Sequence, residues 1–510
     1  MSCAWIVIVA SCHTVAPRAS SSTTIATDAG VVVGQARVGV REFLGIPFAA
    51  PPVGDLRWRA PAPVAPWSSP RDATRRGNAC LQLDGDQRAP ESEDCLVLNV
   101  WAPPVAASAA PVLVWIHGGA FYQGSGNDDL YDGAGLAART GAIVVTINYR
   151  LGPLGWLSHR ALARELGRAT SPSIALLDQR AALTWVQRNA AAFGGDPARV
   201  TIFGESAGAW SVCAQLASPS SRGLYAGAIM QSGACDDALY FEPAVAQAQG
   251  DALAAALGCT EPDPLPCLRG QPAEALVHAL PMKRGSILQP GASWGPVVDG
   301  VELPARPLAA MRAGTALAVP LLIGANRDEG TLHVRGFDEV TTADLVDFVG
   351  TSFGTGAVEP VLARYQRPDP KASLDAIIND GVFGCQARRV ARTLAARGVP
   401  VFLYQFTHPL ADPRVHELGA THSIDLFFVF GNVSLGFGIT DDERPLSWTM
   451  MDAWGAFART GDPTTPALAW PRYDLARDQH AILDVTPGLG EGLAAATCDF
   501  WDALPTRATD

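Results

Sequence analysis

The chain has 510 residues, of which 48% are hydrophobic and 17% are charged. Its 50 Asp and Glu residues outnumber its 38 Lys and Arg residues, giving a formal net charge of −12, and no basic run is interleaved with aromatic residues. This balance argues against nucleic acid as a partner. No Cys/His cluster has zinc spacing and no glycine loop has Walker or dinucleotide-binding form, so we expect neither a metal nor a cofactor.

Residues 1–30 have the character of a leader segment followed by a flexible spacer. Trp5 to Ala10 is a short apolar run, and Val9-Ala10-Ser11-Cys12 resembles a bacterial lipobox with Cys12 as the lipidated residue, although no Lys or Arg precedes it. Residues 20–24 are a Ser/Thr stretch typical of a spacer. We expect export, with Cys12 as a candidate for lipid attachment. No later apolar run approaches the roughly 20 residues of a membrane span.

The first strong strand is expected at Val112 to Ile116, and His117-Gly118-Gly119-Ala120 follows it at once. A Gly-Gly pair after a strand is ordinarily only a turn. Backbone N–H groups in such a loop can also hold the negative charge that forms on an attacked carbonyl oxygen. If a nucleophile follows downstream, Gly118 and Gly119 become candidate oxyanion-hole donors.

Ser206 is the candidate nucleophile. It lies in VTIFGESAGAWSVCAQL, where a β-branched run meets Gly204-Glu205-Ser206-Ala207-Gly208 and then a helix-favouring stretch. This context is typical of a nucleophile elbow, a strained strand-to-helix turn, and it makes the N–H of Ala207 a further oxyanion donor. The same G-x-S-x-G pattern occurs around Ser293 and Ser352, but neither has a strand before it and a helix after it.

A catalytic acid is expected after Ser206 in the chain, at the end of a strand on the same sheet edge. The run VPLLIGANRDEGT fits, because residues 319–324 are typical of a buried strand and residues 326–330 of the turn that follows. That turn carries Asp328 and Glu329. By itself an acidic pair in a turn is more often simply solvated, and spacing alone does not choose between the two.

A histidine must follow the acid, because a serine hydroxyl needs a base to take its proton. Nearby His333 is too close in sequence to reach back easily, and His408 stands between a strand-like run and a proline. His422 lies in the loop ELGATHSIDLFFVFG, which can reach a sheet-edge site, although an isolated histidine is more often structural. The histidines that follow Ser206 are His278, His333, His408, His416, His422 and His480.

Several segments together resemble the type B carboxylesterases, which include the cholinesterases, within the α/β-hydrolase superfamily. The resemblance runs from about Val32 to about Pro505. The segments that carry it are FLGIPFAAPPVGDLRWRAP, SEDCLVLNVWAP, WIHGGAF, VVTINYRLGPLGWL, LLDQRAALTWVQRNAAAFGGDP, FGESAGAWS, MQSG, GANRDEGT, the loop containing His422, and WGAFARTGDPT.

The resemblance assigns the roles that spacing leaves open. It implies that the acid is Glu329 rather than Asp328, that the histidine is His422, and that Gly118, Gly119 and Ala207 form the oxyanion hole. The family usually has glycine after the histidine, whereas this chain has Ser423, so the local backbone is expected to differ slightly.

The resemblance also implies disulfides, and therefore an extracytoplasmic protein. The bonds it implies are Cys80–Cys95, Cys259–Cys267 and Cys385–Cys498, the alternative being buried free thiols. The first would close a loop of about 15 residues, contributing roughly 3 kcal/mol on the chain-entropy model. Cys213 and Cys235 have no evident partner, and we expect them to be buried thiols.

The fold class expected is α/β: an α/β-hydrolase fold with a large, mostly parallel sheet flanked by helices. Strand-like segments of one sheet recur from Val112 to Phe406, so we expect a single catalytic domain over residues 31–510. Helical insertions at about Phe241 to Arg312 and Thr341 to Ala376 are expected to cover the active site.

The expected function is carboxylic ester hydrolysis through an acyl-enzyme on Ser206. Two alternatives are a non-catalytic adhesion or scaffold protein of the same family, which would lack a triad residue, and a lipase acting on long-chain esters. The loop between the first two cysteines contains no aromatic residue, so recognition of a quaternary ammonium there is not supported. Trp294 resembles an acyl-pocket position or is a packing tryptophan, and Leu332 and His333 are expected to line the same gorge. The sequence does not indicate an oligomeric state.

Overall fold

The computed structural model describes residues 22–83, 90–104, 109–235, 239–281, 293–434 and 436–504. Cys12 and most of the expected leader and spacer lie outside these ranges. So do parts of the Cys80–Cys95 loop and of the expected insertion at 241–312.

A mixed sheet of 11 strands forms the centre of the molecule, in the order β16-β15-β14-β13-β12-β11-β9-β10-β8-β4-β3. Neighbouring strands from β10 to β15 are parallel, and the pairs β10–β8, β8–β4, β4–β3 and β15–β16 are antiparallel. The strands of this sheet are β3 (Gln35–Arg37), β4 (Val40–Pro47), β8 (Val97–Ala102), β9 (Ala110–Ile116), β10 (Ile143–Ile147), β11 (Gly195–Glu205), β12 (Gly227–Gln231), β13 (Leu321–Asn326), β14 (Val401–Phe406), β15 (Gln479–Leu483) and β16 (Gly488–Glu491).

Two smaller sheets lie outside the main sheet. One has the order β1-β2-β5 and the other pairs β6 with β7. Their strands are β1 (Thr24–Ala26), β2 (Val31–Val33), β5 (Arg71–Asp72), β6 (Ala79–Cys80) and β7 (Glu91–Ser92).

The central strands are buried on both faces, which explains why they appear in the sequence as continuous hydrophobic runs. In β9 every residue is buried. Val112, Val114 and Ile116 belong to one hydrophobic core, whereas Leu113 and Trp115 belong to a second. Because successive side chains of a strand point to opposite faces, β9 alone separates the two cores.

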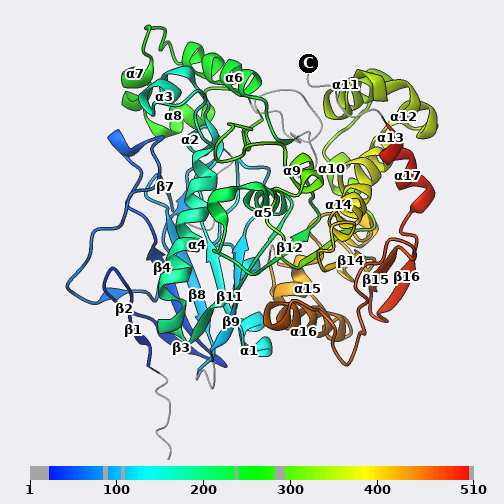
Figure 1. The fold of residues 1–510 in the computed structure, drawn as a ribbon, viewed down its shortest axis with the longest axis horizontal. Helices are drawn as coiled ribbons and strands as arrows, with labels where there is room; N and C mark the ends of the chain where they lie inside the picture. The colour runs from blue at the N-terminus through cyan, green and yellow to red at the C-terminus, as the bar shows by residue number, and fades with distance from the viewer. Residues whose placement is uncertain are drawn as a thin grey trace, which may run out of the picture.

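Helices cover both faces of the sheet (Figure 1). Residues of α4 and α5 pack in the core with Val112, and residues of α1, α15 and α16 pack in the core with Trp115. The helices of the described chain are α1 (Ala134–Thr140), α2 (Gly152–Trp156), α3 (Arg160–Glu165), α4 (Ile174–Phe193), α5 (Ala207–Ala217), α6 (Pro243–Ala256), α7 (Leu265–Gly270), α8 (Ala273–His278), α9 (Pro307–Ala313), α10 (Gly330–Arg335), α11 (Thr342–Phe353), α12 (Val358–Arg364), α13 (Pro370–Ile377), α14 (Cys385–Ala395), α15 (Leu426–Phe430), α16 (Arg444–Thr460) and α17 (Ala495–Ala503).

The expected helical insertions are present in the described residues. In the view of Figure 1, α6, α7 and α8 lie above the sheet on one side, and α11 and α12 lie above it on the other. Between α13 and α14 the chain forms a π-helix, Ile378–Gly384. The architecture is therefore the large, mostly parallel sheet with flanking helices and insertions that the sequence predicts.

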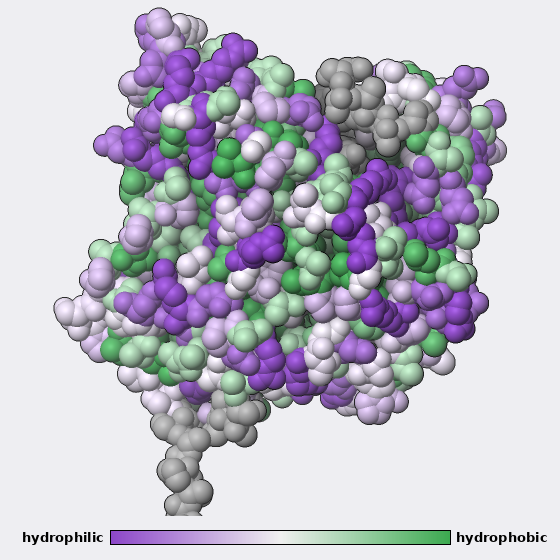
Figure 2. Space-filling model, in the orientation of Figure 1, coloured by the Kyte–Doolittle hydropathy of each residue, from purple (hydrophilic) through white to green (hydrophobic). Residues whose placement is uncertain are grey.

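The surface mixes polar and apolar residues. On the face shown in Figure 2, hydrophilic and hydrophobic residues are interspersed over the coloured part of the molecule. Within the described ranges, no helix is long and apolar enough to cross a bilayer.

Candidate active site

Ser206 lies at the turn between β11 and α5, at the carboxyl end of the parallel strands. Its φ of 54° and ψ of −126° are rare for a residue with a side chain. The Ser206 N–H donates to the Gln231 carbonyl at the end of β12 (3.0 Å). A Cβ on Gly208 would lie 2.0 Å from the Ile116 carbonyl oxygen, so only glycine allows the helix this close to β9.

The other two G-x-S-x-G serines lie in different surroundings. Ser352 is inside α11, and Ser293 is in an irregular segment. Of these three serines, Ser206 alone follows a strand and precedes a helix.

Glu329 and His422 are in direct contact beside this turn. The Nδ1 of His422 lies 2.6 Å from the Oε2 of Glu329, and both side chains are buried. Glu329 follows β13, and its Oε1 accepts a hydrogen bond from the N–H of Asn326 (2.6 Å). The neighbouring Asp328 points elsewhere: its Oδ2 accepts from the N–H of Ala420 and pairs with Arg327, each at 2.8 Å. Of the two acids in this turn, the geometry brings Glu329 to the histidine.

The hydroxyl of Ser206 makes no hydrogen bond with His422 in this structure. The imidazole Nε2 instead lies 3.2 Å from the Oε1 of Glu205, the residue before the serine. Ser206 is buried, with 6% of its surface exposed.

Burial sets the protonation of this group. It lowers the pKa of His422 to about 4, an effect opposed by the charge of Asp425, so the imidazole is neutral and can accept a proton at neutral pH. Burial also raises the pKa of Glu329, while the nearby Ser232 hydroxyl and the N–H of Asn326 favour its carboxylate form.

The loop after β9 packs directly against the serine turn. A Cβ on Gly118 would lie 3.2 Å from the Cβ of Ser206, and a Cβ on Gly119 would lie 2.2 Å from the Gln123 carbonyl oxygen. Gly119 also has a φ of 105°, which favours glycine. The N–H groups of Gly118, Gly119 and Ala207 donate to no other described residue. They remain available for a ligand oxygen near Ser206.

His117 and Tyr149 pack against each other at the start of the loop that carries Gly118 and Gly119. Their rings stack with centroids 4.3 Å apart, and the Tyr149 hydroxyl donates to the His117 carbonyl (2.8 Å). Burial lowers the pKa of His117 to about 4, so its ring is neutral. The loop that carries Gly118 is thus held by a buried, uncharged stack.

A second buried carboxylate, Glu205, was not singled out from the sequence. Its Oε1 accepts a hydrogen bond from the Ser423 hydroxyl (2.6 Å) and faces His422. Behind it, Asp425 accepts from the side-chain amide of Gln231 (2.7 Å). Glu205 and Ser423 are each adjacent in sequence to a predicted site residue. Only the packing of two distant loops shows that they meet.

The π-helix supplies two further contacts that the sequence did not reveal. The Phe383 ring lies 4.8 Å from that of His422, and the Asn379 Oδ1 accepts from the Glu329 N–H (2.9 Å). π-Helical segments are rare and are often found at functional sites. The expected insertion ended at Ala376, just short of this segment.

The expected gorge residues occupy different environments. His333 lies beside the site, its ring 4.8 Å from that of His422 and stacked on Phe383 (5.4 Å). Leu332 is 39% exposed, and Trp294 is buried and lines a small cavity together with Trp156. Elsewhere, His408 lies between Glu443 and Asp484, 3.1 Å from each.

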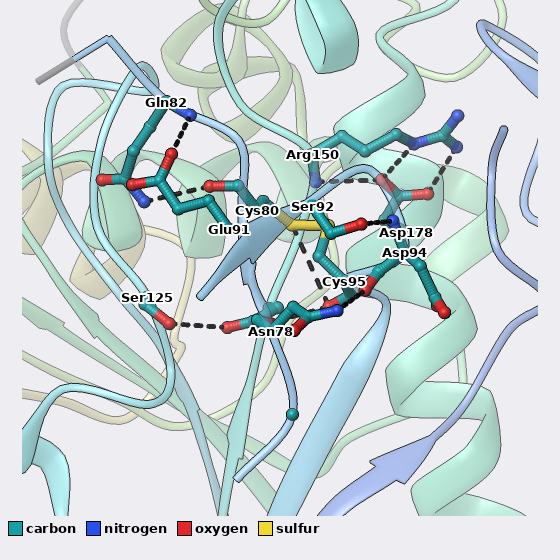
Figure 3. Close-up of a disulfide and its surroundings, with 12 residues drawn as sticks. Asn78, Cys80, Gln82, Glu91, Ser92, Asp94, Cys95, Ser125, Arg150 and Asp178 are labelled. Atoms are coloured by element: carbon teal, nitrogen blue, oxygen red, sulfur yellow. Dashed lines mark hydrogen bonds and ion pairs between the residues drawn. A yellow bond between two sulfur atoms is a disulfide. The ribbon is translucent and has the colours of Figure 1, made fainter. Parts of the chain in front are cut away.

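The structure contains the three disulfides that the resemblance implies. The pairs Cys80–Cys95, Cys259–Cys267 and Cys385–Cys498 have Cα atoms 4.9, 5.6 and 4.9 Å apart. Around the first, the Asn78 amide donates to the Asp94 carbonyl (3.1 Å), tying together the chain on either side of the bond (Figure 3).

The expectation of free thiols at Cys213 and Cys235 is wrong, because these residues form a fourth disulfide with Cα atoms 5.7 Å apart. They are separated by 22 residues, and sequence spacing gave no reason to pair them. The parallel connection from α5 to β12 brings them together. The bond joins the helix that begins after Ser206 to the loop after Gln231, which accepts the serine N–H.

Within the described part of the chain, no group of three His, Cys, Asp or Glu side chains is arranged to hold a metal ion. The groups gathered at the site are a serine, a histidine, carboxylates and free N–H donors. This set suits nucleophilic attack on a carbonyl group.

The pattern of the carboxylesterase family matches residues 21–501. The chain belongs to the carboxylesterase family. It is 40% identical to the para-nitrobenzyl esterase of Bacillus subtilis, covering 90% of this chain and 94% of that protein. It is 35% identical to the acetylcholinesterase of Bungarus fasciatus, covering 98% and 89%, and 35% identical to the fumonisin B1 esterase of Sphingopyxis macrogoltabida, covering 92% and 88%.

The fold of this carboxylesterase agrees with solved structures. A PNB esterase structure superposes with a TM-score of 0.85 at 37% identity, covering 94% of this chain and 99% of that one. A second, described as a thermophilic PNB esterase, also gives a TM-score of 0.85, at 36% identity. The chain is a carboxylic ester hydrolase of the type B carboxylesterase family with an α/β-hydrolase fold.

Proposed function

We propose that this carboxylesterase cleaves esters by two-step acyl transfer, with Ser206 as nucleophile, His422 as base and acid, and Glu329 as the group that orients His422. The observation that carries the proposal is the 2.6 Å contact between Glu329 and His422 beside the strained serine turn. An acceptor on Nδ1 fixes the tautomer in which Nε2 is free to take a proton.

In the first step the Ser206 oxygen forms a bond to the ester carbonyl carbon while its proton passes to Nε2 of His422. The carbonyl π electrons move to oxygen, and the oxyanion receives hydrogen bonds from the N–H groups of Gly118, Gly119 and Ala207. The alkoxy bond then breaks, and the alcohol leaves with the proton from Nε2. Each oxyanion donor is expected to contribute about 3 kcal/mol to transition-state stabilisation.

In the second step water repeats the sequence on the acyl-enzyme. His422 takes a proton from water, the hydroxide oxygen attacks the acyl carbon, and the Ser206 oxygen leaves with that proton. The products are a carboxylic acid and the free enzyme.

The substrate class we propose is uncharged carboxylic esters of short or medium acyl length. Trp294, Leu332 and His333 are the candidate residues that limit the acyl group. The absence of aromatic residues between Cys80 and Cys95 argues against a cationic alcohol as the leaving group. A long-chain preference would make the enzyme a lipase instead.

The function is tested with a series of p-nitrophenyl esters of increasing acyl length, assayed with wild type and Ser206→Ala. Wild type is expected to turn over short and medium esters, and Ser206→Ala to lose about 10³-fold or more in kcat, because removal of the nucleophile leaves only binding and the oxyanion donors.

Ser352→Ala is the matched control, since Ser352 shares the pentapeptide pattern but lies inside α11. Equal turnover by Ser206→Ala and wild type would exclude the mechanism, and absence of turnover in wild type would favour the adhesion or scaffold alternative. An optimum at long acyl chains would favour the lipase.

We further propose that the protein acts outside the cytoplasm. Four disulfides among the described residues support this location. Lipidation at Cys12 is a separate proposal, tested by mass spectrometry of the amino terminus of the mature protein.

A further inference from the structure

Ser423 has a backbone conformation that favours glycine. It directly follows His422 and has a φ of 66°, in the left-handed region. A side chain in this region is strained relative to glycine. Glycine would fit this backbone with less strain, so we look to the contacts of the serine hydroxyl for the reason that serine is present.

The Ser423 hydroxyl has a specific partner. It donates to the Oε1 of Glu205 across 2.6 Å, linking the loop before α15 to the end of β11. The same Oε1 lies 3.2 Å from the Nε2 of His422. Since Glu329 contacts Nδ1, the imidazole lies between two carboxyl groups, one at each ring nitrogen.

We propose that Ser423 is a positioning residue whose hydroxyl holds the Glu205 carboxylate against Nε2 of His422, so that a second carboxylate stabilises the imidazolium formed during turnover. The proposal rests on the proposed function, in which His422 takes the proton of Ser206. The attraction between Glu205 and His422 becomes strong only once that proton has moved. It therefore acts on the transition state more than on the resting enzyme.

The Ser423 hydrogen bond matters because the other surroundings of Glu205 disfavour its charge. Burial, with the nearby charges of Asp425 and Glu329, raises the pKa of Glu205, and the hydrogen bond from Ser423 opposes this rise. Among the described residues, His333 and Tyr404 are two further titratable groups beside this cluster. Burial holds His333 neutral by lowering its pKa and holds Tyr404 neutral by raising its pKa, so neither supplies a counter-charge.

The test compares kcat, KM and the pH profile of kcat/KM for wild type, Ser423→Ala, Ser423→Gly, Glu205→Gln and the double variant Ser423→Ala/Glu205→Gln. Each single variant is expected to lose about tenfold in kcat with KM nearly unchanged, the size typical of a hydrogen bond to a charged group. Without an ionised Glu205 the imidazolium is less stable, so the acid limb should move to lower pH.

The Ser423→Gly variant distinguishes an effect of the lost hydroxyl on kcat from an effect on folding stability. It removes the hydroxyl and also the backbone strain, so its Tm is expected to equal or exceed that of wild type while its kcat falls like that of Ser423→Ala. A loss of kcat in Ser423→Ala alone, with normal activity in Ser423→Gly, would mean that the hydroxyl is not the cause.

The double variant tests whether Ser423 affects catalysis through Glu205. If Ser423 acts through Glu205, adding Ser423→Ala to Glu205→Gln changes neither kcat nor the acid limb further. Additive losses, or wild-type kcat and pH profile in both Ser423 variants, would overturn the proposal. Its failure leaves the proposed function intact, because that function is judged by Ser206→Ala alone.

Discussion

At the scale of single residues, burial is the main influence on the chemistry of this site. His422 is 6% exposed, and Glu205, at its Nε2, is 2% exposed. A buried imidazole loses the hydration that stabilises its charged form, so burial lowers its pKa. The site therefore combines a neutral imidazole with carboxyl groups at both of its ring nitrogens, where the proposed mechanism would form a positive charge.

The pH dependence of activity follows from this burial. The base must be neutral to act, and burial lowers the pKa of His422 from 6.5 to about 4. As the pH falls through 6.5, activity should therefore be retained, and it should decline only at lower pH. The measurement is the acid limb of kcat/KM for a short p-nitrophenyl ester, with circular dichroism at each pH to show that the enzyme remains folded. An acid limb at or above pH 6.5 would contradict this.

At the scale of elements, the turn from β13 into α10 separates two adjacent acids. Glu329 points inward to His422, whereas Asp328 accepts the Ala420 N–H and fixes the loop that leads to the histidine. Under the proposed mechanism Glu329 would orient the base, whereas Asp328 holds the backbone of the loop that carries His422.

Glu329→Gln and Asp328→Asn form a matched pair that tests this division. Glu329→Gln keeps the shape but removes the carboxylate that fixes the His422 tautomer, so kcat should fall by about 10³- to 10⁴-fold. Asp328→Asn should cost far less in kcat and act mainly on stability, since it weakens an accepted N–H bond. Steady-state kinetics and thermal unfolding of both variants provide the comparison, and a larger kcat loss in Asp328→Asn would reverse the assignment.

At the scale of the whole molecule, disulfides join helices and loops that are separate in the sequence but share one hydrophobic core. Cys213–Cys235 joins α5 to the loop after β12, and Cys385–Cys498 joins α14 to α17. The Cys213–Cys235 bond closes a ring of 22 residues that contains β12, the strand whose Gln231 carbonyl accepts the Ser206 N–H. It should stabilise the packing of α5 beside β12, the two elements that flank the serine turn.

The double variant Cys213→Ala/Cys235→Ala measures that contribution. The chain-entropy model for a 22-residue ring predicts a loss of about 3 kcal/mol in unfolding free energy. Urea unfolding is compared with Cys259→Ala/Cys267→Ala, whose 8-residue ring should contribute somewhat less. An unchanged urea midpoint in the first variant would show that the bond does not stabilise the fold.

The sequence predicted the features that depend on local pattern. Strand-to-helix context selected Ser206 over Ser293 and Ser352, and hydrophobic runs indicated the buried parallel strands. Local spacing could not reveal contacts between distant loops, and the pairing of Glu329 with His422 and of Cys385 with Cys498 came only from the family resemblance. Glu205 and Ser423 lie 218 residues apart, so their hydrogen bond leaves no trace in local spacing. The Cys213–Cys235 pairing was missed for the same reason, since it depends on how α5 packs beside β12.

The π-helix before α14 determines where Phe383 lies relative to the His422 ring. A π-turn holds one residue more than an α-turn, and each residue of an α-helix rotates the next side chain by about 100°. Deleting one residue within Ile378–Gly384 would let the segment relax to an ordinary helix and would swing Phe383 away from the imidazole, while α14 kept its place against the sheet. The wall beside the histidine could thus be reshaped by a change in chain length of a single residue, without any alteration to the strands beneath it.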